Sequence, residues 1–237
     1  MFKTLLCIFI LLHIIGDFYC QTDGISKRKH VQYRYVILHS LLYAAVFIAG
    51  SIAARSPLVV PTAAILSVLH YAVDSLKYLY VKYVNSPRKL SEPALYLIDQ
   101  SLHLSLIVIA AAFIADKYYA VFPAAAGGTA VLRWACILLT VCKPANITIK
   151  QMLIKYRPAL TDDDGSNNAG AFIGSLERII ITLLMSVGQY SAIGLVLTAK
   201  SVARYDKISK DQTFSEYYLL GTLLSTLFAI VVFLLVQ

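Results

Sequence analysis

The sequence has 237 residues, of which 59% are hydrophobic and only 14% are charged, and its formal net charge is +8 at pH 7. Soluble domains carry roughly 25% charged residues, so this composition excludes a single water-soluble core. The basic residues stand in short segments between apolar runs, where Lys and Arg favour the cytoplasmic leaflet. The positive charge therefore indicates the lipid bilayer as partner and not nucleic acid.

Apolar runs of about 20 residues recur along the chain, which is the length that crosses a hydrocarbon layer as a helix. They lack the alternation of apolar and polar residues that is typical of barrel strands. We therefore predict an all-α fold, a multi-pass bundle with seven transmembrane helices at residues 2–21, 35–54, 58–82, 94–115, 129–154, 171–200 and 216–236. The first four form a membrane core at 1–120, and the last three form an extension at 121–237 packed on it in a single compact unit.

The first span resembles a secretory signal but lacks a small-x-small cleavage site, so we expect it to be retained. Basic residues in the segments 22–34, 83–93 and 155–170 fall on one side of the membrane if every span crosses it, which places the N-terminus outside. Four basic residues after the sixth span contradict this pattern. A helix that continues past the membrane would explain them, since residues 171–205 would measure about 52 Å as one helix. These four residues are Lys200, Arg204, Lys207 and Lys210.

Four of the predicted spans contain ionisable residues in a regular pattern. An imidazole and a carboxylate stand four residues apart in spans one, three and four, and a lone histidine lies in span two. Residues four apart share one face of an α-helix, so each pair points to one place. The residues are His13 and Asp17, His39, His70 and Asp74, and Asp99 and His103.

Connectivity places these seven groups at a similar depth. Spans one and three carry them in their second halves, just before basic segments, whereas spans two and four carry them in their first halves, just after the same segments. Each ionised group inside a span costs at least about 2.5 to 3.5 kcal/mol on insertion scales, so the groups need compensation. We therefore expect one polar pocket that they all share.

Imidazole and carboxylate ligands without thiolates suit a divalent metal such as Zn, Mn or Fe, in a mononuclear or dinuclear site. All seven groups are candidate ligands, and Asp17, Asp74 and Asp99 are candidate catalytic carboxylates, since one that is not bound to metal can act as general base. The alternative is that paired His and Asp side chains only hold helices together. The four cysteines form no Cys-x-x-Cys pair, and we assign them no metal and no disulfide.

A second group of polar residues is expected to bind substrate. Lys77, Gln21 and Gln100 flank the predicted pocket, and Lys143 with Asn146 in span five shares a face that suits an anionic lipid headgroup. Three features of the second half are expected to be structural. They are an ion pair between Glu177 and Arg178, a kink at Pro144, and close helix packing at Gly188, Gly194 and Gly221.

The motifs of the first half resemble an uncharacterised family of bacterial integral membrane proteins known only as a domain of unknown function. The resemblance covers residues 10–110 and rests on three motifs: His13-x2-Gly16-Asp17-Phe18-x2-Gln21, His70-x3-Asp74-x2-Lys77 and Asp99-Gln100-x2-His103. It implies a bacterial cytoplasmic membrane as location. The His and Asp pattern is more distantly similar to membrane-bound metal-dependent hydrolases, although the second half of this chain does not match that group.

Together these features favour an intramembrane metal-dependent hydrolase that acts on a lipid-linked or phosphate-containing substrate. A transporter or channel for protons or a divalent cation is the alternative, and a nonenzymatic membrane subunit is a third. Polar residues are sparse in the remote halves of the first four spans, which favours an enzyme, because a conduction path needs them through the full thickness. Substrate, metal and oligomeric state stay open.

Overall fold

The computed structural model describes residues 2–53, 58–84, 89–117, 128–157 and 166–237. Contacts divide the chain into two compact units, Met1–Cys136 and Ile137–Gln237, called unit 1 and unit 2 below. The boundary predicted at residue 120 lies outside the described residues, as does half of the predicted basic segment 155–170. The packing of the two parts into one compact unit stays a prediction.

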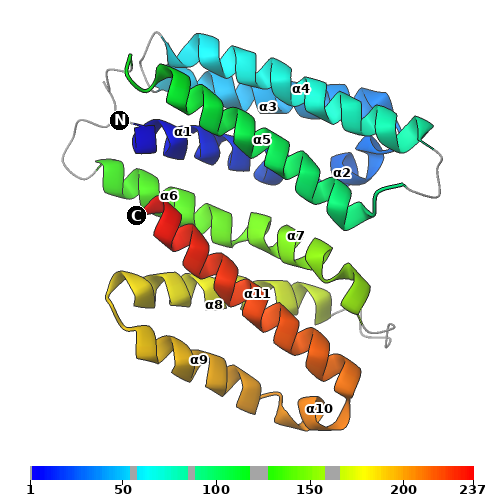
Figure 1. Ribbon diagram of the computed structural model, residues 1–237, viewed down its shortest axis with the longest axis vertical. Helices are drawn as coiled ribbons and strands as arrows, with labels where there is room; N and C mark the ends of the chain where they lie inside the picture. Colours follow the sequence, from blue (N-terminus) through cyan, green and yellow to red (C-terminus); the bar gives the residue numbers. More distant parts are fainter. Residues whose placement is uncertain (1, 54–57, 85–88, 118–127, 158–165) are drawn as a thin grey trace. The chain divides into compact units, whose positions relative to one another are not determined.

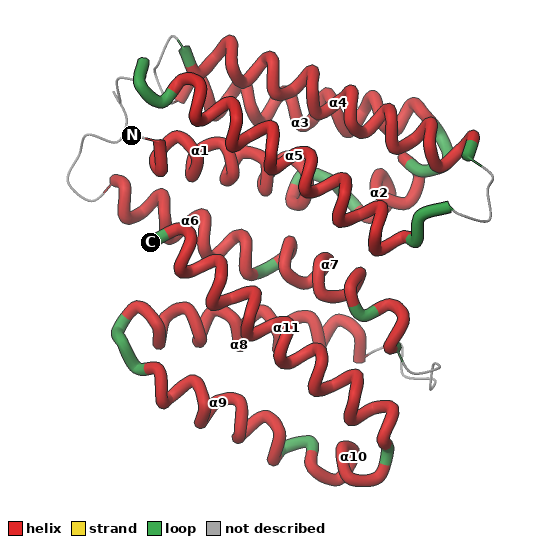
Figure 2. The backbone as a smooth tube through the Cα atoms, viewed as in Figure 1, coloured by secondary structure: helices red, strands yellow, loops and turns green. Residues whose placement is uncertain are grey.

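The described residues are almost entirely helical and contain no β-strand, which confirms the all-α prediction (Figures 1 and 2). Unit 1 contains α1 (Phe2–Ile14), the π-helix η1 (Ile15–Tyr19), α2 (Asp23–Lys29), α3 (Tyr33–Ala53), α4 (Val59–Tyr83), α5 (Glu92–Ile114) and most of α6 (Gly128–Val141). Unit 2 contains α7 (Lys143–Met152), the 3-10 turn η2 (Ile154–Tyr156), α8 (Ser166–Ser186), α9 (Tyr190–Val202), α10 (Tyr205–Lys210) and α11 (Gln212–Val236).

Seven helical segments of the described part are long and apolar enough to cross a membrane, as the sequence predicts. Their large side chains remain exposed on the outside, with 63% of Leu41, 66% of Val68 and 80% of Phe113 accessible. A helix that is apolar on all sides requires an apolar environment. The chain therefore has the pattern of a multi-pass membrane protein. The segments are Phe2–Tyr19, Tyr33–Ala53, Val59–Tyr83, Glu92–Ile114, Gly128–Met152, Ala169–Ser186 and Gln212–Val236.

Unit 1 is built around α1, which packs against α3 and α5 while α4 packs against both of these helices. The half of the bundle that contains the start of α1 has an apolar core. Phe9 and Phe47 stack with ring centroids 6.4 Å apart, and Ala63 and Ala111 are fully buried beside them. This core fixes the spacing of the four helices, and the ionisable residues lie beyond it, toward the opposite end of the bundle.

The sixth span differs from its prediction, because residues 171–200 form two antiparallel helices and not one. The helix α8 ends at Ser186, and α9 returns along it, so that Lys200 near the end of α9 lies 2.5 Å from the carboxylate of Glu177 in α8. The side chain of Lys200 also lies over the ring of Tyr218 in α11, at 5.4 Å from the centroid. The expectation of one long helix that passes the membrane surface is therefore wrong, and residues 200–210 lie at the end of unit 2 where α8 begins (Figure 1).

The reversal occurs at Gly188, whose backbone has a φ of 71°. Only glycine adopts this left-handed conformation without steric strain. A Cβ added at Gly188 would meet no atom within 4 Å, and the same holds for Gly194. The expectation that these two glycines allow close helix packing is wrong, whereas a Cβ on Gly221 would touch the side chain of Leu153 at 3.4 Å.

Arg178 anchors the interior of unit 2. The expectation that Arg178 forms an ion pair with its neighbour Glu177 is wrong, because Glu177 forms an ion pair with Lys200 instead. The guanidinium of Arg178 donates to the backbone oxygen of Val141, to Asn146 Oδ1 and to Ser225 Oγ. The Val141 oxygen lies at a break in the helix at Cys142, and a break here is expected from Pro144.

A comparison of two glycines tests the reversal. We expect Gly188→Ala to lower the free energy of unfolding by about 1 to 2 kcal/mol, because alanine is strained at positive φ. Gly194→Ala is the matched control, since its added Cβ also meets open space. It lies inside α9, where alanine is favoured over glycine by about 0.8 to 1.0 kcal/mol. Thermal unfolding in detergent micelles measures both variants, and equal melting temperatures would contradict the left-handed turn.

Candidate metal centre

The seven ionisable groups of spans one to four lie together in unit 1. They come from α1, η1, α3, α4 and α5, and all seven are buried. Their exposed fractions are 1% for His13, 6% for Asp17, 0% for His39, 1% for His70, 4% for Asp74, 5% for Asp99 and 3% for His103. We call this set the His/Asp cluster. The convergence expected from spacing and connectivity is therefore present, and the roles of the residues as ligands or catalysts stay predictions.

His39 lies at the middle of the cluster. Its Nε2 atom is 3.0 Å from Asp17 Oδ1, 3.2 Å from His70 Nε2 and 3.4 Å from Asp74 Oδ2. The ring of His70 in turn stacks on the ring of His103, with centroids 4.2 Å apart. Side chains from different helices thus approach one another as closely as ligands of a common ion do.

The pairs spaced four residues apart are not hydrogen-bonded. The closest nitrogen and oxygen atoms are 3.9 Å apart in the pair of His13 with Asp17, and 3.7 Å apart in the other two pairs. Hydrogen bonds between nitrogen and oxygen are normally 2.7 to about 3.2 Å long. Mutual pairing within each helix therefore does not explain why these residues are buried.

Six buried atoms of the cluster have no hydrogen-bond partner within the described part of the chain. A buried polar atom without a partner costs about 1 to 3 kcal/mol, so six in one place require an explanation. A coordinated cation would satisfy those that face the middle of the cluster, whereas the Nδ1 atoms of His39 and His70 lie on the far side of rings that meet through Nε2. The atoms are His13 Nε2, His39 Nδ1, His70 Nδ1, Asp74 Oδ2, Asp99 Oδ1 and His103 Nε2.

Two overlapping sets of three residues have the spacing of metal ligands. Asp17, His39 and His70 form one set, and His70, Asp74 and His103 form the other, with all ligand atoms in each set within 4.8 Å of one another. Ligand atoms that each lie about 2.0 to 2.2 Å from one ion are at most about 4.4 Å apart, so only a small contraction is needed. Nitrogen and oxygen donors of this kind suit Zn, Mn or Fe. The residues fit such an ion.

The π-helix η1 positions Asp17. The backbone N–H of Cys20 donates to the oxygen of Ile15 at 2.8 Å, five residues earlier, so the helix widens at this point. Residues 2–21 are expected from the sequence to form one α-helical span, and a local sequence pattern does not predict the extra residue in the turn. Such π-helical turns frequently occur at functional sites. Here the wider turn accompanies the cross-helix contact between Asp17 and His39.

Tyr43 belongs to the site, although the sequence analysis did not identify it. Its hydroxyl lies 3.2 Å from His13 Nδ1, and its ring is parallel to that of His70 with centroids 3.6 Å apart. A Cβ on Gly16 would lie 2.8 Å from Tyr43 Cδ2, so glycine at this position permits the close approach of η1 to α3. The available signal was the position of Tyr43 one helical turn after His39.

Lys29 was also missed as a site residue, because it stood among the basic residues of a predicted surface segment. It ends the short helix α2, is only 8% exposed, and places its ammonium 3.6 Å from Asp74 Oδ2. Burial acts to lower the pKa of Lys29, but the charges of Asp74, Asp17 and Asp99 together raise it above its ordinary value. Lys29 therefore carries a positive charge at the cluster.

The remaining predicted residues divide between the two units. Lys77 donates to Asp99 Oδ2 at 2.8 Å, and Gln100 donates to Asp17 Oδ2 at 2.8 Å. Gln21 is half-buried two residues after the end of η1. Asn146 and Lys143 belong to α7 in unit 2, where Asn146 bonds to Arg178 and to Ser175. Lys143 is half-buried at the start of that helix, and substrate binding by these five residues stays a prediction.

Comparisons with known proteins place the chain in a family without adding an activity. No curated protein and no solved structure gives a significant match. One family profile, described as "Protein of unknown function (DUF3307)", matches residues 5–125, which span α1 to α5 and contain the whole His/Asp cluster. This confirms the resemblance to an uncharacterised family. With half of its length matched, the chain belongs to the DUF3307 family of proteins of unknown function.

Proposed function

We propose that this protein is a metal-dependent hydrolase that acts within the membrane on an anionic substrate, either lipid-linked or phosphate-containing. The observation that carries the proposal is the buried cluster with two overlapping ligand sets and six polar atoms that lack hydrogen-bond partners. A divalent ion bound there would lower the pKa of a coordinated water and so supply a nucleophile near neutral pH.

The side chains around the cluster have separate roles in this proposal. Asp17, Asp74 and the four histidines hold the ion, and Tyr43 orients His13 through its hydroxyl. Asp99 is the best-placed general base. Its Oδ2 accepts from Lys77 and Gln100, which leaves Oδ1 without a partner and able to accept a proton.

The charges of the site favour an anionic substrate. Three carboxylates stand against the two ammonium groups of Lys29 and Lys77, so the cluster with neutral histidines has a formal charge of −1. A divalent ion changes this sum to +1. The site would then attract a phosphate or carboxylate group of the substrate. Lys29 and Lys77 approach the cluster from different helices, so their ammonium groups can bind the oxygens of that substrate group.

The apolar half of unit 1 makes the transporter alternative less favourable. Beyond the cluster, the interior is filled by a core that includes Phe9, Phe47 and Ile107. The two buried serines at this level donate to backbone oxygens of their own helices, Ser51 to Ile48 and Ser67 to Ala63. A conduction path needs polar groups or water through the full thickness, and the described residues of this half offer none.

A purely structural role for the cluster is also less favourable. Side chains that only join helices are expected to satisfy one another, as Arg178 and its acceptors do in unit 2. The cluster leaves six of its polar atoms without partners instead. A nonenzymatic subunit therefore explains less of the geometry than a metal centre does.

We further propose that the protein lies in the bacterial cytoplasmic membrane with its N-terminus outside. The return of α9 along α8 supports this orientation, because it moves Lys200, Arg204, Lys207 and Lys210 to the side of the other basic segments. All four basic segments then face the cytoplasm, as the positive-inside pattern favours. The site would open toward that leaflet.

Metal analysis tests the centre directly. We expect purified protein to contain one or two divalent ions per chain and His70→Ala to lose them, because His70 belongs to both ligand sets. His30→Ala is the matched control, since His30 is exposed and is the one histidine of the sequence outside the cluster. Elemental analysis after gel filtration measures both. Metal content that does not differ between the two variants would eliminate the centre.

A second experiment separates hydrolysis from transport. We expect phosphate release from phosphatidic acid or a polyprenyl diphosphate in mixed micelles, reduced about 10²- to 10⁴-fold by Asp99→Asn because a general base is lost. Asp116→Asn, at an exposed position beyond α5, should leave the rate unchanged. Sealed proteoliposomes should show no proton or divalent-cation flux. A flux that Asp74→Asn abolishes would instead establish transport.

Single cysteines in a cysteine-free background test the orientation. Positions Ser26, Ser91 and Ser209 should react alike with a membrane-impermeant maleimide, because α2, the start of α5 and α10 all lie on the cytoplasmic side in this proposal. Gln189, in the turn between α8 and α9, should give the opposite response. If Ser209 reacted like Gln189, α9 would not return across the membrane and the orientation would lose its support.

A further inference from the structure

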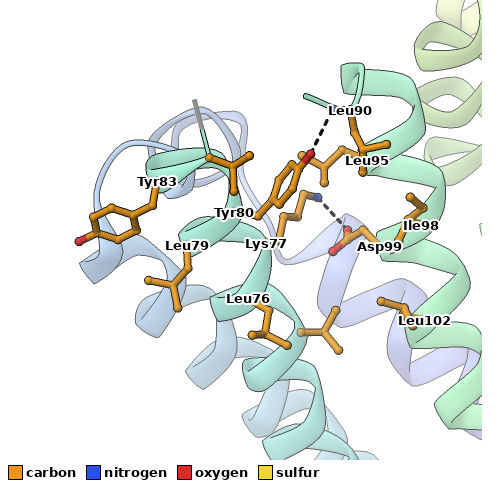
Figure 3. A pocket seen from close by; sticks show the side chains of 12 residues that line it. Leu76, Lys77, Leu79, Tyr80, Tyr83, Leu90, Leu95, Ile98, Asp99 and Leu102 are labelled. Carbon is orange, nitrogen blue, oxygen red and sulfur yellow. Dashed lines mark hydrogen bonds and ion pairs between the residues drawn. The ribbon is translucent and has the colours of Figure 1, made fainter. Parts of the chain in front are cut away.

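A groove of about 600 Å³ lies between α4 and α5, next to the His/Asp cluster (Figure 3). It is lined by α4 from Val73 onward and by the chain from Leu90 to Leu102. Two charged side chains, Lys77 and Asp99, occur in its lining, and the other lining residues are aliphatic or tyrosine. Its volume is in the range of sites that hold small organic molecules.

The polar point of the groove is also part of the cluster. Lys77 reaches across from α4 to Asp99 Oδ2 at 2.8 Å, as the dashed line in Figure 3 shows. The other oxygen of Asp99 lies 3.7 Å from His103 Nε2. Asp99 is therefore shared between the groove and the candidate metal centre, so a molecule that binds at Lys77 lies next to the centre.

Specific contacts hold the groove open at its end near the 83–93 segment. The backbone N–H of Leu90 donates to the Tyr80 hydroxyl at 3.0 Å, and Lys89 Nζ donates to the backbone oxygen of Val81, also at 3.0 Å. These bonds fix the chain before α5 against the last turns of α4. The groove is thus a feature of the fold and not a gap between loosely placed side chains.

The outer wall of the groove faces the surroundings of the bundle. The exposed fractions are 66% for Leu76, 45% for Ile98 and 48% for Leu102, and all three belong to spans. Molecules in the bilayer therefore have direct access. Val73, Leu76 and Leu102 lie deeper in the membrane than Lys77 and Asp99, whereas the other apolar lining residues lie toward the basic segments. A lipid of the same leaflet with its headgroup at Lys77 would place a hydrocarbon chain against this deeper part of the groove, toward the midplane.

We propose that this groove binds one hydrocarbon chain of an anionic membrane lipid and places the lipid headgroup at Lys77, beside the cluster. The proposal rests on the proposed function in two respects, namely that the bound lipid is the substrate and that the basic segments face the cytoplasm. The ammonium of Lys77 has three hydrogens, so it can hold a phosphate oxygen while it keeps Asp99. The substrate class is then an anionic lipid that enters sideways from the cytoplasmic leaflet.

Photocrosslinking in vesicles tests the groove. The probe is phosphatidic acid with a diazirine in one acyl chain, present in phosphatidylcholine vesicles that contain the full-length protein. We expect crosslinks at Leu76 and Leu102, and we expect unlabelled phosphatidic acid to compete for them while extra phosphatidylcholine does not. Crosslinks spread equally over lipid-facing residues of α3, α4 and α5 would overturn the proposal.

Bulky substitutions make the test specific. Leu102→Trp and Leu76→Trp fill the groove and should reduce crosslinking about tenfold, the loss expected when roughly two buried methylenes are displaced. Leu41→Trp is the matched control, because Leu41 is also a leucine on a span, is 63% exposed and lies outside the groove. An equal reduction in all three variants would contradict a groove site. The melting temperature of each variant checks that it is folded.

The same preparations separate this proposal from the proposed function. Metal bound at the cluster together with loss of selective crosslinking would reject the groove and leave the centre intact. Selective crosslinking in protein without bound metal would keep the groove and reject the metal-dependent hydrolase. Lys77→Met should abolish the preference for phosphatidic acid over phosphatidylcholine, and an unchanged preference would reject the headgroup position.

Discussion

Three carboxylates lie within the membrane-spanning part of unit 1, where the surrounding lipid supplies neither water nor counterions. Each ionised group in such a place costs at least about 2.5 to 3.5 kcal/mol on insertion scales. The structure compensates them with groups from every neighbouring element: Lys29 from α2, Lys77 from α4, Gln100 from α5 and four imidazoles. The compensation is incomplete, because six polar atoms still lack partners. That remaining deficit is the physical basis for placing a cation in the cluster.

The need to compensate these buried charges explains why unit 1 divides into a polar half and an apolar half. All groups that need compensation lie at one depth, and the other half is filled by a close-packed apolar core around Phe9 and Phe47. The core sets the distances between helices, and hydrogen bonds between helices, such as those of His39 with Asp17 and of Lys77 with Asp99, hold side chains at the polar end. In the proposed function and orientation, substrate would reach the cluster from the cytoplasmic leaflet, either from the basic segments or through the groove between α4 and α5. Binding, chemistry and release would then all occur in one leaflet.

Unit 2 also contains buried charged side chains, and it compensates them in a different way. Its buried cation, Arg178, bonds to neutral acceptors, one of which is the Val141 oxygen at the break before Pro144. Its buried carboxylate, Glu177, is reached by Lys200 only because the chain reverses at Gly188. Both charges thus have a partner within the unit, although Glu177 Oε1 itself has no hydrogen-bond partner. Both groups of side chains with the spacing of metal ligands that occur among the described residues lie in unit 1, so unit 2 offers less reason for a bound ion. In the proposed orientation, unit 2 contributes membrane anchoring and a basic surface on the cytoplasmic side.

Hydropathy alone determined the helical fold and the seven helices of the described part that are long and apolar enough to span a membrane, because twenty consecutive apolar residues have few alternatives to a helix in lipid. The spacing and order of the His and Asp residues also predicted that they would meet, since helices that cross a membrane fix the depth of each residue. Tertiary structure decided the features that depend on single contacts. These are the π-helical turn at Asp17, the stacking of Tyr43 on His70, the burial of Lys29 and the groove beside Lys77. The reversal at Gly188 also depends on the φ angle of one residue. Hydropathy averaged over a window of residues does not detect the conformation of a single glycine.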